Sequence, residues 1–438
     1  MATTRRQFMK SSSAMLGAAG LGTMPTQLLY GDSGSTPPPC TLVALYLRGG
    51  ADPLNIIVPY REKRYYDVRP TIAIPPERRG DTAGVIRLSN DKRFGFHPAL
   101  RELAVMYESG LVAPIVNVGS THPTRSHFDA QDFMERAAPG IKTINEGWLN
   151  RYLGVTRTDG DSELRAISLQ AVLPRSLRGQ YPVLAVPEEG ANHAMGVFGT
   201  LYGCDSEKEA ISQMQEPPGS GGGSPSDPEA ATRQKIVEAG AHSIRKLRRL
   251  NSIIHQGSSS VVYPKSRLAS QLRGVARLIQ ANERLEIAAI DYNGWDHHAY
   301  QGGSMGTMAE MLRNLSGSIK AFFDDLGPRR DRVVVLAMTE FGRTVKENGT
   351  NGSDHGHGGF LLAIGGPVVG GKVYGKWTGL DRAVLNEGRD MPVYTDFRSA
   401  FAETLSGLFG FRADQNEFFP EFKSEAKSLG FIRQMGSA

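Results

Sequence analysis

A short apolar run begins the predicted core of this chain: Thr41-Leu42-Val43-Ala44-Leu45-Tyr46-Leu47, followed at once by Arg48-Gly49-Gly50. A continuous run of this length is typical of a strand buried on both faces of a sheet. Three further β-rich runs have the same character: 111–118, 285–290 and 333–338. The segment 308–326 has the apolar spacing of a helix. Strand, helix and strand in this order predict an α/β fold with a mainly parallel sheet covered by helices on both faces.

Polar motifs follow four of the predicted strands. These motifs are Arg48-Gly49-Gly50-Ala51-Asp52, residues 119–129, Gly294-Trp295-Asp296-His297-His298 and Thr339-Glu340-Phe341-Gly342-Arg343-Thr344. Ligands and catalytic groups in parallel sheets gather beyond the carboxyl ends of the strands. We therefore expect the four motifs to meet at one edge of the sheet.

Two clusters of histidine and aspartate indicate a metal site. Asp354-His355-Gly356-His357-Gly358-Gly359 places one carboxylate and two imidazoles within four residues, and the glycines let the backbone bend around an ion. Imidazole and carboxylate suit divalent ions such as zinc and manganese. In an extended segment Asp296 and His298 point the same way, so they are the predicted pair in the second cluster. The alternatives are a polar turn and histidines that only pack loops.

Strand ends supply three further candidates. Glu340 directly follows an apolar run, and a carboxylate buried there needs a partner. Arg343 either pairs with Glu340 or binds an oxyanion through its guanidinium. Asp52 follows two glycines that allow a sharp turn back over the sheet, although an ordinary turn or capping aspartate has the same pattern.

Ser126 precedes a predicted helix that runs to about residue 138. Backbone N–H groups at a helix start favour negative charge, which suits a nucleophile. An ordinary N-cap serine occupies the same position, with Asp129 three residues later, so the two interpretations stay open. Arg125 is a candidate for holding an anionic group of the substrate.

The N-terminus resembles a twin-arginine export signal. Thr4-Arg5-Arg6-Gln7-Phe8-Met9-Lys10 is followed by a weakly hydrophobic stretch at 14–21, so residues 1–36 are interpreted as signal peptide and leader. This predicts export by the twin-arginine translocase to a periplasmic or extracellular location. Cys40 and Cys204 are permitted to pair there, but the sequence does not decide whether they do.

Composition limits the remaining function classes. The formal charge is +5, and no apolar run reaches the roughly 20 residues of a membrane span. A charge this small and dispersed argues against nucleic-acid binding.

Residues 190–280 are predicted to form a mostly helical insertion or cap, interrupted by a Gly/Pro/Ser-rich linker at 216–228.

Several motifs in fixed order resemble the DUF1501 family of exported bacterial proteins. They are Leu45 to Asn55, Ser126-His127-Phe128-Asp129-Ala130-Gln131-Asp132, Gly147-Trp148-Leu149-Asn150-Arg151-Tyr152, residues 339–344 and residues 354–359. That family is placed in the alkaline phosphatase and sulfatase superfamily. The resemblance implies a three-layer αβα sandwich over residues 40–438.

The resemblance also implies two metal ions and a nucleophile between them. One ion would be held by Asp52, Asp354 and His355, and the other by Asp296, His298 and His357. Glu340 fills a ligand position in some members of the superfamily. The His357 and His298 spacings are shorter than usual in the superfamily. The expected ions are zinc or manganese, with calcium or magnesium as alternatives.

Thr121-His122-Pro123-Thr124-Arg125 has the outline of a sulfatase signature, with threonine at the position of the modified residue. Threonine cannot form the required aldehyde, so Thr121 remains only a second nucleophile candidate. The expected activity is metal-dependent hydrolysis of phosphate or sulfate esters, acting on a small anionic ester or a sulfated or phosphorylated polysaccharide. The alternative is a non-catalytic exported protein that binds metal or polysaccharide with the same fold.

Overall fold

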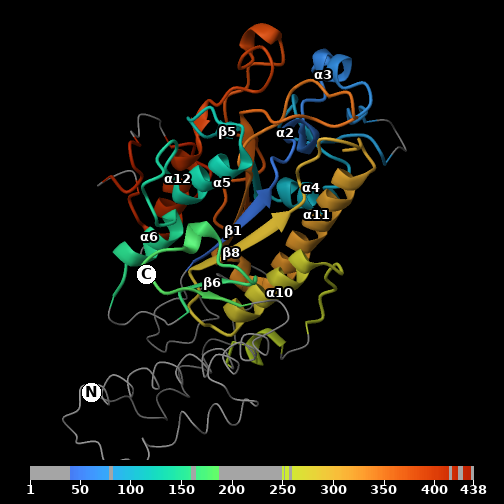
Figure 1. Cartoon of the computed structure of the whole chain (residues 1–438). Coiled ribbons are helices and arrows are strands. Elements are labelled where there is room, and N and C mark those ends of the chain that lie inside the picture. The colour runs from blue at the N-terminus through green and yellow to red at the C-terminus, as the bar shows by residue number, and fades with distance from the viewer. Residues whose placement is uncertain are drawn as a thin grey trace, which may run out of the picture. The chain divides into compact units, whose positions relative to one another are not determined.

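In the computed structural model, strand β1 (Thr41–Arg48) lies in the middle of the main sheet, with a parallel neighbour on each side (Figure 1). Its apolar residues alternate between two cores: Val43, Leu45 and Leu47 pack on one face of the sheet. Leu42 and Tyr46 pack on the other. The unbroken apolar run follows from this, because both faces of the strand are covered.

The structure describes residues 40–77, 82–158, 164–186, 249–250, 252–255, 259–413, 417–422 and 428–435. They belong to one compact unit, Pro38–Ser437. The predicted leader at 1–36, the linker at 216–228, Cys204 and most of the predicted insertion lie outside the described residues.

Within the described residues the main sheet has eight strands. Their spatial order is β11 (Thr395–Asp396), β5 (Val112–Gly119), β10 (Gly359–Gly365), β9 (Val333–Met338), β1, β8 (Ile287–Asn293), β6 (Ala166–Ser168) and β7 (Leu184–Ala185). Strand β10 runs antiparallel to both its neighbours, and the other pairings are parallel. The predicted mainly parallel sheet is confirmed.

Helices cover both faces of this sheet, as the sequence predicted (Figure 1). The helices on one face are α4 (Arg101–Glu108), α10 (Arg267–Gln280) and α11 (Thr307–Leu326). Those on the other face are α5 (His127–Arg136), α6 (Trp148–Val155) and α12 (Phe397–Phe409). Helix α10 is the last part of the predicted insertion, and it packs against α11 and β8 as one of the covering helices.

Shorter elements connect these layers. They are helices α2 (Pro53–Ile56) and α3 (Lys63–Val68), a small sheet of β2 (Ile57–Val58), β4 (Gly95–Phe96) and β3 (Ile86–Arg87), and 3-10 turns at Arg175–Leu177, Gly327–Arg332 and Arg382–Val384. No helix in the described part of the chain is both long and apolar enough to cross a membrane.

Two glycines let the loops at the end of β1 and β8 approach closely. Gly49 and Gly50 have φ angles of 125° and 66°, a region that residues with a side chain rarely adopt. A Cβ on Gly49 would lie 2.5 Å from the backbone nitrogen of Asp296, and one on Gly50 would lie 2.6 Å from the Phe341 ring. The glycine pair is therefore required for the polar motifs to meet.

Candidate metal centre

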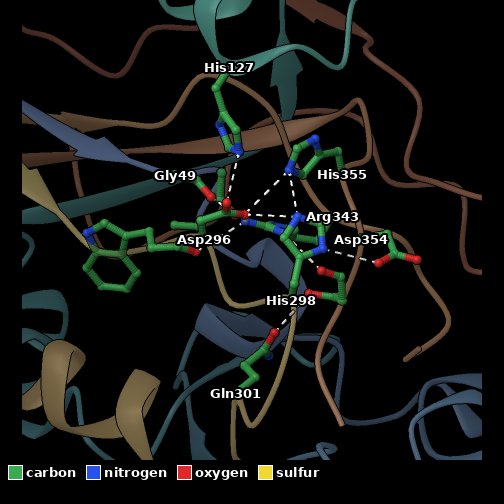
Figure 2. A network of polar contacts seen from close by, with 12 residues as sticks. Gly49, His127, Asp296, His298, Gln301, Arg343, Asp354 and His355 are labelled. Carbon is green, nitrogen blue, oxygen red and sulfur yellow. Dashed lines mark hydrogen bonds and ion pairs between the residues drawn. The ribbon is translucent and has the colours of Figure 1, made fainter. Parts of the chain in front are cut away.

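The predicted polar motifs meet beyond the carboxyl ends of β1, β8 and β9, where Arg343 joins them (Figure 2). Its buried guanidinium donates to the Gly50 carbonyl (2.5 Å), to the Ser353 carbonyl (2.9 Å) and to the Asp296 carboxylate (2.5 Å). It also donates to the Gly49 carbonyl. Every nitrogen of this side chain is thereby committed to the protein. The structure thus gives Arg343 the role of a buried clamp between loops, with four of its five N–H groups donating to the protein, whereas the sequence suggested a ligand for the substrate anion.

Imidazole and carboxylate groups converge beside this clamp. One oxygen of Asp296 lies 3.2 Å from Nε2 of His298 and 3.4 Å from Nε2 of His355, and the other lies 3.4 Å from Nε2 of His127. The ligand atoms of His127, Asp296 and His355 lie within 4.8 Å of one another. Nε2 of His298 is 2.8 Å from Nε2 of His355. Figure 2 shows the three rings turned toward the Asp296 carboxylate.

Glu340 fixes the orientation of His127. Its buried carboxylate accepts hydrogen bonds from Nδ1 of His127 (2.8 Å), from Gln131 (2.8 Å) and from the Gly49 amide (2.9 Å). Burial alone would raise the pKa of Glu340, but the hydrogen bonds from His127 and Gln131 hold it below its ordinary value. Glu340 is therefore an acceptor, which places the His127 proton on Nδ1. Nε2 of His127 is buried and has no hydrogen-bond partner.

The other two rings are oriented in the same way. Nδ1 of His355 lies 2.8 Å from the Arg125 carbonyl, which can only accept. Nδ1 of His298 lies 3.3 Å from the carboxylate of Asp354. Burial lowers the pKa of His355, which favours the neutral imidazole that a metal binds. Acceptors behind ligating histidines commonly set the tautomer in this manner.

This donor set fits a divalent cation. When each ring is neutral with its proton on Nδ1, Nε2 of His127, His298 and His355 carries a lone pair near the Asp296 carboxylate. The hydrogen bond to Glu340 raises the pKa of His127, so a bound cation would replace the proton that is favoured there. Lone pairs held together without a proton or cation between them repel. Hydrogen bonding and the Arg343 guanidinium hold the pKa of Asp296 below its usual value against the effect of burial. The imidazoles of His127 and His355 with the Asp296 carboxylate, and His298 beside them, form a set that suits zinc or manganese.

Asp52 has partners that differ from those the resemblance implies. Its carboxylate is 2% exposed and accepts from Arg69 (2.5 Å), from Gln301 (2.7 Å) and from the Leu54 amide (3.2 Å). Arg69 is itself fully buried. An ion at Asp52 would have to displace a buried guanidinium, so the structure gives Asp52 an ion pair and the N-cap of α2 in place of a ligand position.

The predicted residues Asp354 and His357 lie around the cluster of His127, Asp296, His298 and His355. Asp354 is half-exposed, and its carboxylate accepts from Asn348 (2.9 Å) and faces His298. Burial lowers the pKa of His357, and the charges that act on its ring include Asp390 and Arg125. In the part of the chain described, neither His357 nor His298 is among the grouped metal-ligand atoms, but Nε2 of His298 lies 2.8 Å from Nε2 of His355.

The residues predicted around the nucleophile are an arginine that is paired with carboxylates and two exposed residues that carry hydroxyl groups. One terminal nitrogen of the Arg125 guanidinium pairs with Asp390 (3.1 Å) and Glu387 (2.9 Å), so two carboxylates already balance its charge, while its buried Nε has no hydrogen-bond partner. Ser126 is exposed and is the N-cap residue of α5, but its hydroxyl makes no capping hydrogen bond. Thr121 is exposed in the turn before this helix.

His127 is the site residue whose role the sequence did not predict. It is the first residue of α5, directly after Ser126, and the predicted helix start drew attention to capping. A signal was present: His127, Gln131 and Glu135 follow at four-residue spacing and share one helix face. Glu340 was predicted as a ligand, and the structure places it behind His127.

Taken together, the fold and the site define an α/β protein with a histidine-rich cluster at the carboxyl ends of its strands. Residues 112–411 match the family described as "Protein of unknown function (DUF1501)", so the chain belongs to the DUF1501 family, as the motifs predicted. No curated protein matches the sequence.

Similar solved structures include the C-terminal periplasmic domain of EcEptC from Escherichia coli in complex with Zn (8% identity, TM-score 0.31, 76% of this chain and 74% of that chain). Another is the alkaline phosphatase from the Antarctic bacterium TAB5 (10% identity, TM-score 0.29, 76% and 92%). A third is BT1596, a 2-O GAG sulfatase (10% identity, TM-score 0.31, 91% and 76%). Likeness at these TM-scores carries no argument about the site, which rests on its own geometry.

Proposed function

We propose that this protein is an exported, metal-dependent hydrolase of phosphate or sulfate esters. The observation that carries the proposal is the convergence of three imidazole Nε2 atoms on the Asp296 carboxylate, with Nε2 of His127 buried and without a hydrogen bond. Perturbed and unpaired polar groups of this kind are typical of functional sites. Export to the periplasm or cell surface is proposed from the twin-arginine pattern at 1–36.

His127, Asp296, His298 and His355 would hold the ion, zinc or manganese being the best match to their donors. A divalent ion bound there would supply Lewis-acid polarisation of the ester's anionic oxygens. Glu340 would keep His127 in the ligating tautomer. A second ion remains part of the proposal only if His357 or Asp354 turns toward the centre.

Ser126 is the proposed nucleophile because both residues beside it touch the centre. The Arg125 carbonyl accepts from His355, and the His127 ring faces Asp296. The Ser126 hydroxyl is exposed and uncommitted at the start of a ten-residue helix, where the helix dipole favours developing negative charge. Attack by this oxygen would form a bond to phosphorus or sulfur while the bond to the leaving alcohol breaks, and the serine proton would pass to the leaving oxygen. Water would then release phosphate or sulfate and restore the Ser126 hydroxyl.

The test is hydrolysis of 4-nitrophenyl phosphate and 4-nitrophenyl sulfate by protein reconstituted with zinc or manganese. Ser126→Ala should reduce kcat by more than about a hundredfold and leave metal content unchanged. Thr121→Ala is the matched control, because it removes a neighbouring exposed hydroxyl. Hydrolysis that survives Ser126→Ala, or that disappears only in Thr121→Ala, would reject Ser126 as the nucleophile.

One observation favours a second candidate, a non-catalytic metal- or polysaccharide-binding protein. Arg125 and Arg343, the two expected anion clamps, are both committed to groups of the protein itself. A reconstituted metal centre that hydrolyses neither ester, together with ligand binding that is insensitive to Ser126→Ala, would favour this second function.

A further inference from the structure

A cavity of about 760 Å³ lies beside α5, lined by residues of that helix, of the segment 170–178 and of the end of β8. This volume is in the range of pockets that bind small organic molecules. Three of its lining residues matter most below: Phe128, Arg48 and Asp291. None of them belongs to the cluster of His127, Asp296, His298 and His355.

The lining of the cavity holds six basic and four acidic side chains, and several of them pair with one another. Arg48 contacts Asp291 (2.8 Å) and Glu135 (3.0 Å), and Lys142 contacts Asp129 (2.7 Å). The pairs leave two more basic than acidic side chains in the lining, so anionic substituents on a ligand would be attracted here. A hydroxyl group both donates and accepts, so it can bridge a guanidinium and a carboxylate that are already paired. The cavity therefore suits a polyhydroxylated ligand that carries anionic substituents.

Phe128 gives the cavity an apolar face. Its side chain is 90% exposed, although a phenyl ring normally gains free energy by burial. Val172, also exposed, lines the same cavity. A flat aromatic surface beside planar polar groups matches a sugar ring, whose C–H face is apolar and whose edge carries hydroxyls.

The cavity is joined to the candidate metal centre through α5. The Gln131 side chain accepts from Arg48 (3.1 Å) in the cavity wall and donates to Glu340 (2.8 Å), which holds His127. Phe128 follows His127 directly in the helix. The cavity wall and the metal centre therefore share helix α5 and the Gln131 side chain.

We propose that this cavity binds the saccharide portion of the substrate, with the ester group directed to the metal centre. The position of the ester rests on the proposed function, whereas saccharide binding in the cavity requires no chemistry at the metal. The substrate class is accordingly a sulfated or phosphorylated saccharide, and Phe128 is a specificity-determining residue.

The experiment titrates the full chain with a set of sulfated disaccharides, their unsulfated counterparts and inorganic sulfate, using isothermal titration calorimetry. Phe128→Ala should weaken disaccharide binding about tenfold, and Asn293→Ala, at the exposed polar edge of the cavity, should also weaken it. Val262→Ala is the control, because Val262 is equally exposed but lies outside the cavity. Inorganic sulfate binding should be unaffected by all three changes.

Disaccharide affinities that are the same in Phe128→Ala, Asn293→Ala and wild type would overturn the cavity proposal, as would the absence of any disaccharide binding. The two proposals fail separately. Saccharide binding without ester hydrolysis would reject the hydrolase and keep the cavity site. Hydrolysis whose KM for sulfated disaccharides is unchanged by Phe128→Ala would keep the hydrolase and reject the cavity site.

Discussion

At the scale of single residues, the position of one proton on each imidazole determines what the site can bind. His127, His298 and His355 each direct Nδ1 at an acceptor and Nε2 at the Asp296 carboxylate. Glu340 acts on the centre through His127 and makes no direct contact with Asp296 among the bonds described. The removal of such a supporting acceptor generally weakens metal binding without removing a ligand.

Asp52 provides a residue-scale prediction. Asp52→Asn should leave the metal content unchanged and lower the free energy of unfolding by about 3–5 kcal/mol, because the fully buried Arg69 loses its counter-charge. Urea unfolding and elemental analysis measure the two effects. The matched control is Asp67→Asn, which makes the same chemical change in the exposed Lys63–Asp67 pair and should cost little. Loss of metal with unchanged stability would instead make Asp52 a ligand.

At the scale of elements, the sequence predicted the strands that are apolar on both faces and the helix whose apolar residues recur at helical spacing. The run 41–47 became β1, 333–338 became β9 and 308–326 became α11. Strand β10 was not predicted, because the glycine-rich motif before it suggested a loop. Its antiparallel direction depends on how the chain returns between β5 and β9, which a local run of apolar residues does not encode.

The site was predictable for similar reasons. Asp296 and His298 follow the end of β8 in a polar cluster, and the parallel sheet brings such ends together. His355 lies just before β10, whose antiparallel direction places its start beside the ends of β5 and β9. The partner of Asp52 was not predictable, since nothing near Asp52 in the sequence indicates where the Arg69 side chain arrives. His127 was hidden by its place in the first turn of a helix, where a capping pattern explains the local sequence equally well.

At the scale of the whole molecule, the sheet separates two cores, and the site lies where the central strands end. His97 is a buried titratable residue that does not belong to the group of candidate metal ligands. Its protonation is coupled to folding. Its ring is fully buried between the Gly303 carbonyl and the Ala99 amide. Burial lowers the pKa of His97 to about 4 from the ordinary value near 6.5.

This shift predicts a pH dependence of stability. Below pH 6.5 the unfolded chain binds a proton at His97 while the folded chain does not, so the free energy of unfolding falls as the pH drops toward 4. The contribution of this one group is about 3 kcal/mol over that window. Urea unfolding between pH 7 and 4 should show a shallower decline in His97→Gln and an unchanged one in the exposed His255→Gln. Equal pH slopes in His97→Gln and wild type would contradict the assignment.

The central claim is that His127, Asp296, His298 and His355 form a metal centre. The most direct measurement is the metal content of the untagged full chain by mass spectrometry, after incubation with zinc or manganese and dialysis. We predict at least one divalent ion per chain, its loss in Asp296→Ala, and affinity weakened about 10–100-fold in Glu340→Gln. A wild-type chain that retains neither zinc nor manganese, or that retains the same amount as Asp296→Ala, would contradict the account.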